Sequence, residues 1–162
     1  MSILSWSGSA KDFHILVVDD DAHESDLLGD ALRELRPGTT VHNVSSSENA
    51  IRFLYGDGDF GDCPMPDLVF LDYRMPSNGG RVLSILKGDP DLRMIAVVVL
   101  TAGASSEDIQ EIYARHANCC INKPIEASDL NQEVRAALGF WMDVAVQTRC
   151  HARPIRRSAS QA

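Results

Sequence analysis

The stretch "ILVVDDDAHES", residues 15–25, places four branched apolar residues directly in front of three aspartates. With the two residues before it, the apolar run becomes "FHILVV" (13–18), which is typical of a buried strand. Adjacent carboxylates repel one another, so such a cluster requires compensating positive charge, and a divalent cation is one source of it. The stretch therefore predicts a strand that delivers carboxylates to the edge of a sheet.

Similar apolar runs alternate with helical patterns along the rest of the chain. Strands are expected at 13–18, 39–44, 67–72, 94–101 and 118–122, and helices, with their capping and stop residues, at 24–38, 45–58, 80–90, 105–117 and 126–142. Strands separated by helices require crossover connections, so the sheet should be parallel and covered on both faces. The pattern predicts an α/β fold.

Polar residues stand at the carboxyl ends of these strands, where parallel α/β sheets bind their ligands. Asp19 and Asp20 follow the first strand, Asp72 ends the third, Thr101 ends the fourth and Lys123 follows the fifth. Carboxylates suit Mg²⁺, and a carboxylate beside Mg²⁺ and a lysine can attack phosphorus to give an aspartyl phosphate. Each residue alone has a structural explanation as a helix cap or a turn, but their joint arrival at strand ends indicates a phosphoryl-transfer site.

Composition sets the class of protein in which this site lies. The chain has 162 residues, the size of one ordinary domain, and 44% of them are apolar. No apolar run approaches the roughly 18–20 residues of a membrane span, and the N-terminus lacks the pattern of a signal peptide. The net charge of −8 argues against broad nucleic-acid binding. We expect a cytoplasmic protein that binds neither DNA nor membranes.

Charged residues are unevenly distributed along the chain. The 11 basic and 23 acidic residues of 1–148 give this segment a net charge of −12, whereas four arginines and no acidic residue lie from Arg149 onward.

No CxxC pair or His–Cys metal spacing involves the four cysteines, so we expect free thiols in a reducing compartment rather than disulfides. These cysteines are Cys63, Cys119, Cys120 and Cys150.

The strand ends resemble those of a known family. The segments "ILVVDDD", "PDLVFLDYRMP", "VVVLTA" and "INKP" are similar, in order and character, to the receiver domain of two-component response regulators. The resemblance covers about 13–142 and implies a doubly wound, flavodoxin-like sheet of strand order 2-1-3-4-5. It also implies phosphorylation by a histidine kinase, with the chain catalysing its own phosphotransfer and autodephosphorylation. Residues 1–12 are then a flexible N-terminal segment, and 143–162 a C-terminal tail.

The resemblance assigns a role to each acidic residue. It implies that Asp72 is the phosphoacceptor and that Asp20 binds Mg²⁺ directly. It implies that Asp19 binds the metal directly or through water, and that the backbone carbonyl of Arg74 is a further ligand. Asp21 has no such role, and we expect it to cap the first helix.

The same resemblance assigns the remaining positions. Thr101 is implied as the switch hydroxyl, Lys123 as the contact to the phosphoryl group, and Pro124 as the residue after a cis peptide bond. Cys120 stands where many receivers carry an aromatic switch residue, so the usual aromatic readout is in question. Gly79 stands where family members often have Asp, which should remove a cap of the third helix.

A closer resemblance is to the stand-alone regulators paired with bacterial and cyanobacterial phytochromes. It rests on "YGDGDFGDCPMPDL", "LKGDPDLRMIAVVVLT", "ANCCINKP" and the later "GFW". It implies that the cognate kinase is a bacteriophytochrome or a similar light sensor. Only 21 residues follow Trp141, too few for an output domain, so we expect the signal to leave through protein contacts.

The apolar residues near the end of the last helix have two interpretations. Phe140, Trp141 and Met142 either complete the packing of that helix or form a homodimer surface, because exposed apolar patches usually mark interfaces. A homodimer would form there, or through the face made by the fourth helix, fifth strand and fifth helix.

Two other functions compete with phosphoacceptance. A pseudo-receiver would act as a scaffold without phosphate; Cys120 leaves room for it, but the complete polar set argues against it. An aspartate-nucleophile phosphatase would need an acid two residues after the nucleophile, and Arg74 stands there instead.

Overall fold

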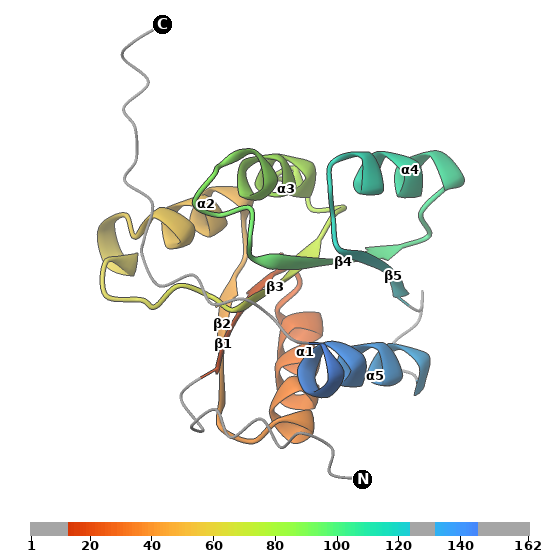
Figure 1. Ribbon diagram of the computed structural model, residues 1–162, viewed down its shortest axis with the longest axis horizontal. Coiled ribbons are helices and arrows are strands. Elements are labelled where there is room, and N and C mark those ends of the chain that lie inside the picture. The colour runs from red at the N-terminus through yellow and green to blue at the C-terminus, as the bar shows by residue number, and fades with distance from the viewer. Residues whose placement is uncertain (1–12, 124–131, 146–162) are drawn as a thin grey trace, which may run out of the picture.

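Five strands alternate with helices in the computed structural model, which describes residues 13–123 and 132–145 (Figure 1). The elements are β1 (Phe13–Val18), α1 (Ala22–Leu35), β2 (Thr39–Val44), α2 (Ser47–Tyr55), the 3₁₀ turn η1 (Gly58–Phe60), β3 (Leu68–Asp72), α3 (Gly79–Gly88), β4 (Ala96–Ala102), α4 (Ser106–Ala114), β5 (Cys119–Lys123), α5 (Gln132–Gly139) and the π-helical turn η2 (Phe140–Val144). No helix among the described residues is long and apolar enough to cross a membrane.

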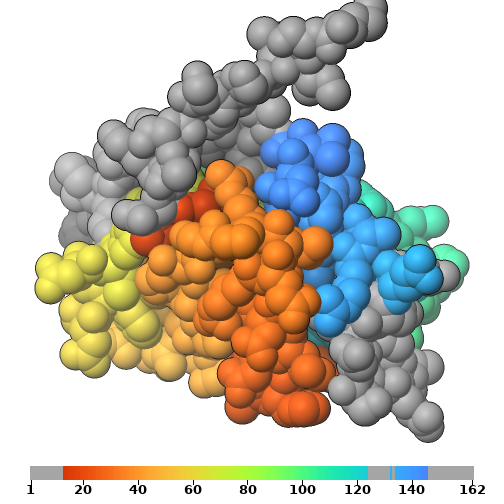
Figure 2. All heavy atoms as spheres, turned by 90° about the horizontal axis from the view of Figure 1, so that it is seen from below, coloured from red at the N-terminus to blue at the C-terminus, as the bar shows by residue number. Residues whose placement is uncertain are grey.

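All four strand pairings are parallel, and the strand order is β2-β1-β3-β4-β5, as predicted. Helices α2, α3 and α4 cover one face of the sheet, and α1 and α5 cover the other (Figure 1). Helix α5 and η2 lie against α1 (Figure 2). The doubly wound fold places the carboxyl ends of the strands at one edge.

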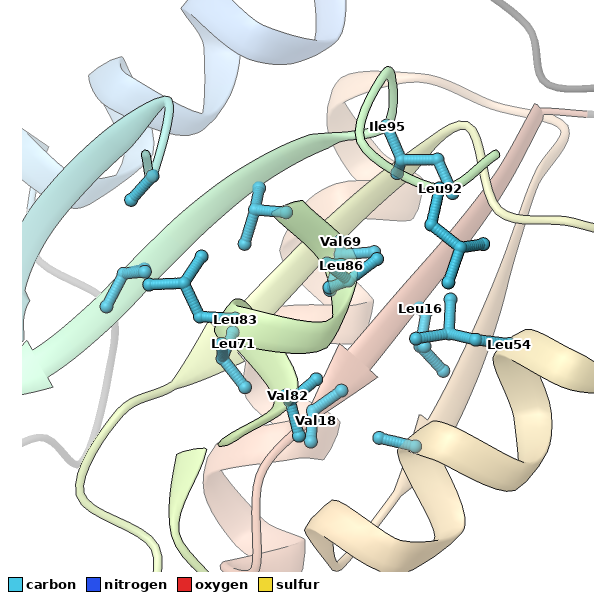
Figure 3. Packing of buried hydrophobic residues seen from close by; sticks show 14 of the residues in the cluster. Leu16, Val18, Leu54, Val69, Leu71, Val82, Leu83, Leu86, Leu92 and Ile95 are labelled. Atoms are coloured by element: carbon cyan, nitrogen blue, oxygen red, sulfur yellow. The ribbon is translucent and has the colours of Figure 1, made fainter. Parts of the chain in front are cut away.

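Each face of the sheet has its own apolar core. Val69 and Leu71 of β3 pack beneath α2 and α3, together with Leu83 and Leu86 (Figure 3). The alternate residues of the same strand pack toward α1 and α5. Burial on both faces explains why the strands are almost continuously apolar rather than alternating.

Side-chain caps fix where the helices begin. The Asp21 carboxylate accepts a hydrogen bond from the Glu24 backbone nitrogen at 3.0 Å, which confirms the predicted cap of α1. The expected loss of the α3 cap is wrong, because the Asn78 side chain accepts from the Arg81 nitrogen instead. Gly79 must be glycine here, since a Cβ would overlap the Asp72 carbonyl oxygen and lie 2.8 Å from that of Tyr73.

The last described helix ends differently from its pattern. The predicted α-helix widens after Gly139, where the Ala145 nitrogen donates to the Phe140 carbonyl at 2.8 Å. Met142 is only 3% exposed and belongs to the core with α1, whereas Phe140 is 51% exposed. Of the three proposed dimer residues, Met142 therefore completes the packing of the domain and offers no surface to a partner.

Candidate functional site

The carboxyl ends of β1 and β3 bring three predicted acids together. Val18 is in register with Leu71, so Asp19, just after β1, and Asp72, the last residue of β3, lie side by side. One carboxylate oxygen from each of Asp19, Asp20 and Asp72 lies within 4.8 Å of the other two. Asp19 is buried, Asp72 is partly buried and Asp20 faces solvent. Residues 53 positions apart thus form one acidic cluster.

Backbone N–H groups hold two of these carboxylates in place. Asp19 accepts a hydrogen bond from the Asp21 nitrogen at 2.9 Å, and Asp72 accepts one from the Arg74 nitrogen at 3.0 Å. Burial raises the pKa of the Asp72 carboxyl above its ordinary value, and Asp19 and Asp20 raise it further. The nearby Lys123 ammonium and the bond from Arg74 oppose this shift of the pKa. The surroundings of Asp72 therefore disfavour its ionised form.

Lys123, at the end of β5, supplies positive charge to the cluster. Its ammonium lies 2.8 Å from Asp19 and 3.6 Å from Asp72, and its side chain is 13% exposed. It also lies 2.5 Å from the carboxylate of Glu24, a residue that sequence reasoning did not select. Burial alone lowers the pKa of Lys123, but the bonds to Asp19 and Glu24 outweigh it and raise the pKa above its ordinary value. The ammonium is thus held among three carboxylates.

Thr101 lies near the end of β4, beside the β3 strand that ends at Asp72. The residue is fully buried, and its hydroxyl has no hydrogen-bond partner in the part of the chain that the structure describes. Buried polar groups are almost always hydrogen-bonded, so this hydroxyl is available to an acceptor that enters the site. The buried Thr39 hydroxyl, at the start of β2, is unpartnered in the same way, so the position of Thr101 beside Asp72 is what relates it to the site.

The other predicted positions have mixed outcomes. The Arg74 guanidinium binds Asp108 of α4 at 2.6 Å, and the metal role of its carbonyl stays a prediction. Cys120 is partly buried, and its backbone nitrogen donates to the Tyr113 hydroxyl at 3.2 Å. Burial raises the pKa of the Cys120 thiol, which favours the neutral form. Pro124 and its peptide bond lie outside the described residues.

The donor set fits a hard dication. Three carboxylates converge, whereas one lysine is the single cation paired directly with them in the described ranges. Mg²⁺ binds through one or two carboxylates and keeps several waters, which an exposed Asp20 beside a buried Asp19 allows. The arrangement can therefore bind Mg²⁺ and an anionic group that shares it.

Comparisons with known proteins agree with this geometry. The family model of the response regulator receiver domain matches residues 15–135. Response regulator Rcp1 of Synechocystis is 32% identical over 130 residues, which cover 80% of this chain and 88% of that protein. The phosphorylated cyanobacterial phytochrome response regulator RcpA has a TM-score of 0.79 at 32% identity, and the Mn²⁺-bound form of Rcp1 has 0.78 at 30%. Both similarities cover 85% of this chain and 99% of the other. The chain therefore belongs to the response regulator receiver domain family.

Proposed function

We propose that this protein is a response regulator of two-component signalling that accepts a phosphoryl group on Asp72 from a histidine kinase. The observation that carries the proposal is the convergence of Asp19, Asp20 and Asp72 with Lys123 at the carboxyl edge of the sheet. The unpartnered hydroxyl of Thr101 adds a donor for a phosphoryl oxygen.

The chemistry assigns one task to each side chain. An Asp72 oxygen attacks phosphorus on the kinase phosphohistidine; the new O–P bond forms as the P–N bond breaks, and the imidazole leaves with the electron pair. Bound Mg²⁺ would neutralise charge on the transferring group, held by Asp19, Asp20 and Asp72, with the Arg74 carbonyl as a further ligand. Lys123 turns its ammonium to a phosphoryl oxygen. In autodephosphorylation, water attacks the same phosphorus, the bond between the Asp72 oxygen and phosphorus breaks, inorganic phosphate leaves and the carboxylate is restored.

The loop after Asp72 offers a route from this chemistry to the surface. Arg74 pairs with Asp108 of α4, and the Tyr73 hydroxyl donates to Glu111 of the same helix at 3.1 Å. Glu111 in turn accepts from Arg115, which reaches Ser84 of α3. A shift of this loop on phosphorylation therefore displaces α4, and the balance between two arrangements carries the signal. This coupling does not require an aromatic residue at position 120.

The partners follow from the relatives and the surface. RcpA is a phytochrome response regulator by name, so we propose a phytochrome-type histidine kinase as the phosphoryl donor in the cytoplasm. The net charge of −8 disfavours nucleic acid as the downstream target, so we propose that the signal passes to another protein through direct contacts. Two of the predicted homodimer residues remain candidates for that surface: Phe140, which is half-exposed, and Trp141, which is partly buried and packs edge-on against Phe140.

Phosphate chemistry tests this function directly. The protein is incubated with radiolabelled ATP and candidate phytochrome kinases, and separately with acetyl phosphate, each with and without Mg²⁺. We expect label that is stable to acid, is released by base or hydroxylamine, requires Mg²⁺ and is lost in Asp72→Asn. Asp59→Asn, an exposed aspartate of η1, serves as the control and should label normally. Full labelling of Asp72→Asn would remove the proposal.

A phosphate-independent scaffold is the alternative for which Cys120 leaves room, because the aromatic residue that many receivers carry at this position is missing. Titration of Mg²⁺ against tryptophan and tyrosine fluorescence, with and without acetyl phosphate, separates the two functions. A phosphoacceptor changes its fluorescence further when acetyl phosphate is added to the magnesium-bound protein, and a scaffold does not.

A further inference from the structure

Glu24 lies outside the acidic cluster, yet it makes the shortest contact of Lys123. The ammonium is 2.5 Å from the Glu24 carboxylate, compared with 2.8 Å for Asp19 and 3.6 Å for Asp72. The two residues are separated by 99 positions and come from α1 and β5. Because the Glu24 side chain is 42% exposed, burial does not force this pairing.

The start of α1 places Glu24 at the site. The Asp21 carboxylate accepts from the Glu24 backbone nitrogen at 3.0 Å, which fixes the first turn directly after Asp19 and Asp20. Glu24 then projects from that turn to the end of β5, and Asp19 meets the same ammonium from the end of β1.

Lys123 and a dication compete for the same oxygens. The ammonium bonds Asp19 and lies within ion-pair distance of Asp72, and both carboxylates belong to the cluster that fits the metal. An ammonium has three N–H donors, and the bond to Glu24 engages one of them away from the cluster. Without Glu24, those donors are free to turn to Asp19 and Asp72, where they oppose metal binding.

We propose that Glu24 is a positioning residue that holds Lys123 to the α1 side of the site and keeps Asp19 and Asp72 available to Mg²⁺. The inference rests on the proposed function, because it concerns the metal on which phosphotransfer depends. It assigns a role to the first turn of α1 beyond the two metal-binding aspartates before it.

A double-mutant cycle on Mg²⁺ affinity tests this role. Mg²⁺ is titrated into the full chain by calorimetry for the original protein, Glu24→Gln, Lys123→Met and the double variant. We expect Glu24→Gln to weaken Mg²⁺ binding about fivefold when Lys123 is present and at most about twofold in Lys123→Met, a coupling in the range of contacting pairs. Lys123→Met alone should tighten Mg²⁺ binding, because a competitor is removed.

The cycle distinguishes a Glu24 that positions Lys123 from a Glu24 that attracts Mg²⁺ only through its negative charge. If Glu24 acted only through its negative charge, Glu24→Gln would weaken Mg²⁺ binding equally in both backgrounds, and the inference would be overturned. Glu34→Gln is the matched control, because it removes the same charge from the other end of α1, where Glu34 pairs with Arg135 at 3.0 Å. An equal loss of affinity in Glu34→Gln would also overturn it.

Phosphate uptake from acetyl phosphate is measured on the same four proteins. An original protein that binds Mg²⁺ but takes no phosphate would remove the proposed function and leave the cycle interpretable. A protein that takes phosphate but shows no coupling between Glu24 and Lys123 would remove only this inference.

Discussion

At the scale of single residues, the Thr101 hydroxyl should lower the stability of the unphosphorylated protein while it serves the response to phosphate. Its buried hydroxyl has no partner among the described residues, and such a group costs about 1–3 kcal/mol of desolvation. Thr101→Val keeps the shape of the side chain and removes that polar group. We therefore expect the free energy of unfolding of the unphosphorylated protein, measured in urea, to rise by about 1 kcal/mol.

The same variant should lose the response to phosphate. Without the hydroxyl, addition of acetyl phosphate and Mg²⁺ should label Asp72 but produce little of the fluorescence change seen in the original protein. Thr101→Ser is the control, because it keeps the hydroxyl and should keep the response. A Thr101→Val protein that is markedly less stable would show that the hydroxyl has a partner.

Single residues also show which parts of the site could be predicted from the sequence and which could not. Residues at the carboxyl ends of strands, such as Asp72 and Lys123, could be placed from the sequence because a parallel sheet collects strand ends at one edge. Glu24 could not, since its partner is set by how α1 docks beside β5, and the helical pattern records only that it lies in a first turn. Asn78 caps α3 with its backbone at a φ of 70°, a conformation that the sequence pattern does not reveal.

At the scale of elements, Lys87 joins α3 to the start of β4 and to the residue before β5. Its ammonium donates to the carbonyls of Arg93 and Ile95, at 3.2 and 2.8 Å, and to the Asn118 side chain at 2.8 Å. Lys87→Met should cost about 1–3 kcal/mol in urea unfolding, because the partly buried Ile95 carbonyl loses its donor and the links to Arg93 and Asn118 are lost with it. Arg81→Met, on an exposed position of the same helix, should stay within about 0.5 kcal/mol. Equal costs for the two variants would contradict this role.

The same lysine explains an error in a strand boundary. The run "MIAVVVLT" predicted a strand from Met94, but β4 begins at Ala96. The Ile95 carbonyl is occupied by Lys87, and the Ile95 nitrogen donates to Leu92 in a turn. Apolar character predicted burial of Ile95 correctly, whereas pairing was decided by a side chain from another element. The centres of the strands, decided by burial alone, could be predicted.

At the scale of the whole molecule, a histidine pair makes stability depend on pH. His14 and His42, on neighbouring strands, share a ring-nitrogen contact of 3.2 Å. His42 also packs against Phe53 of α2, which contacts Phe60 of η1, and the Arg52 guanidinium lies over the Phe60 ring. Burial lowers the pKa of His42, and the charge of His14 lowers it further.

The sign of the pH effect follows from that lowered pKa. The unfolded chain binds a proton at His42 more readily than the folded chain, so this stability is complete above the ordinary pKa near 6.5 and declines as pH falls below it. Urea midpoints measured from pH 8 to pH 5 should decrease, and His42→Gln should flatten the part of the decrease that lies just below pH 6.5. An unchanged slope in His42→Gln would assign the dependence to other groups.

The acidic cluster should also affect the stability of the whole molecule, in one direction without Mg²⁺ and in the other with it. Burial raises the pKa of Asp72, so ionisation of this carboxyl opposes folding, and Asp72→Asn should raise the urea midpoint of the metal-free protein. Mg²⁺ acts in the opposite sense on the original protein: at about 100 times its dissociation constant it should add about 2.7 kcal/mol to the free energy of unfolding. Asp72→Asn should lose most of that increment, because it lacks one carboxylate of the cluster, whereas Asp59→Asn should keep it. A cluster that is merely solvated would show neither effect: Mg²⁺ would stabilise no variant, and removing the charge of Asp72 would bring no gain in stability.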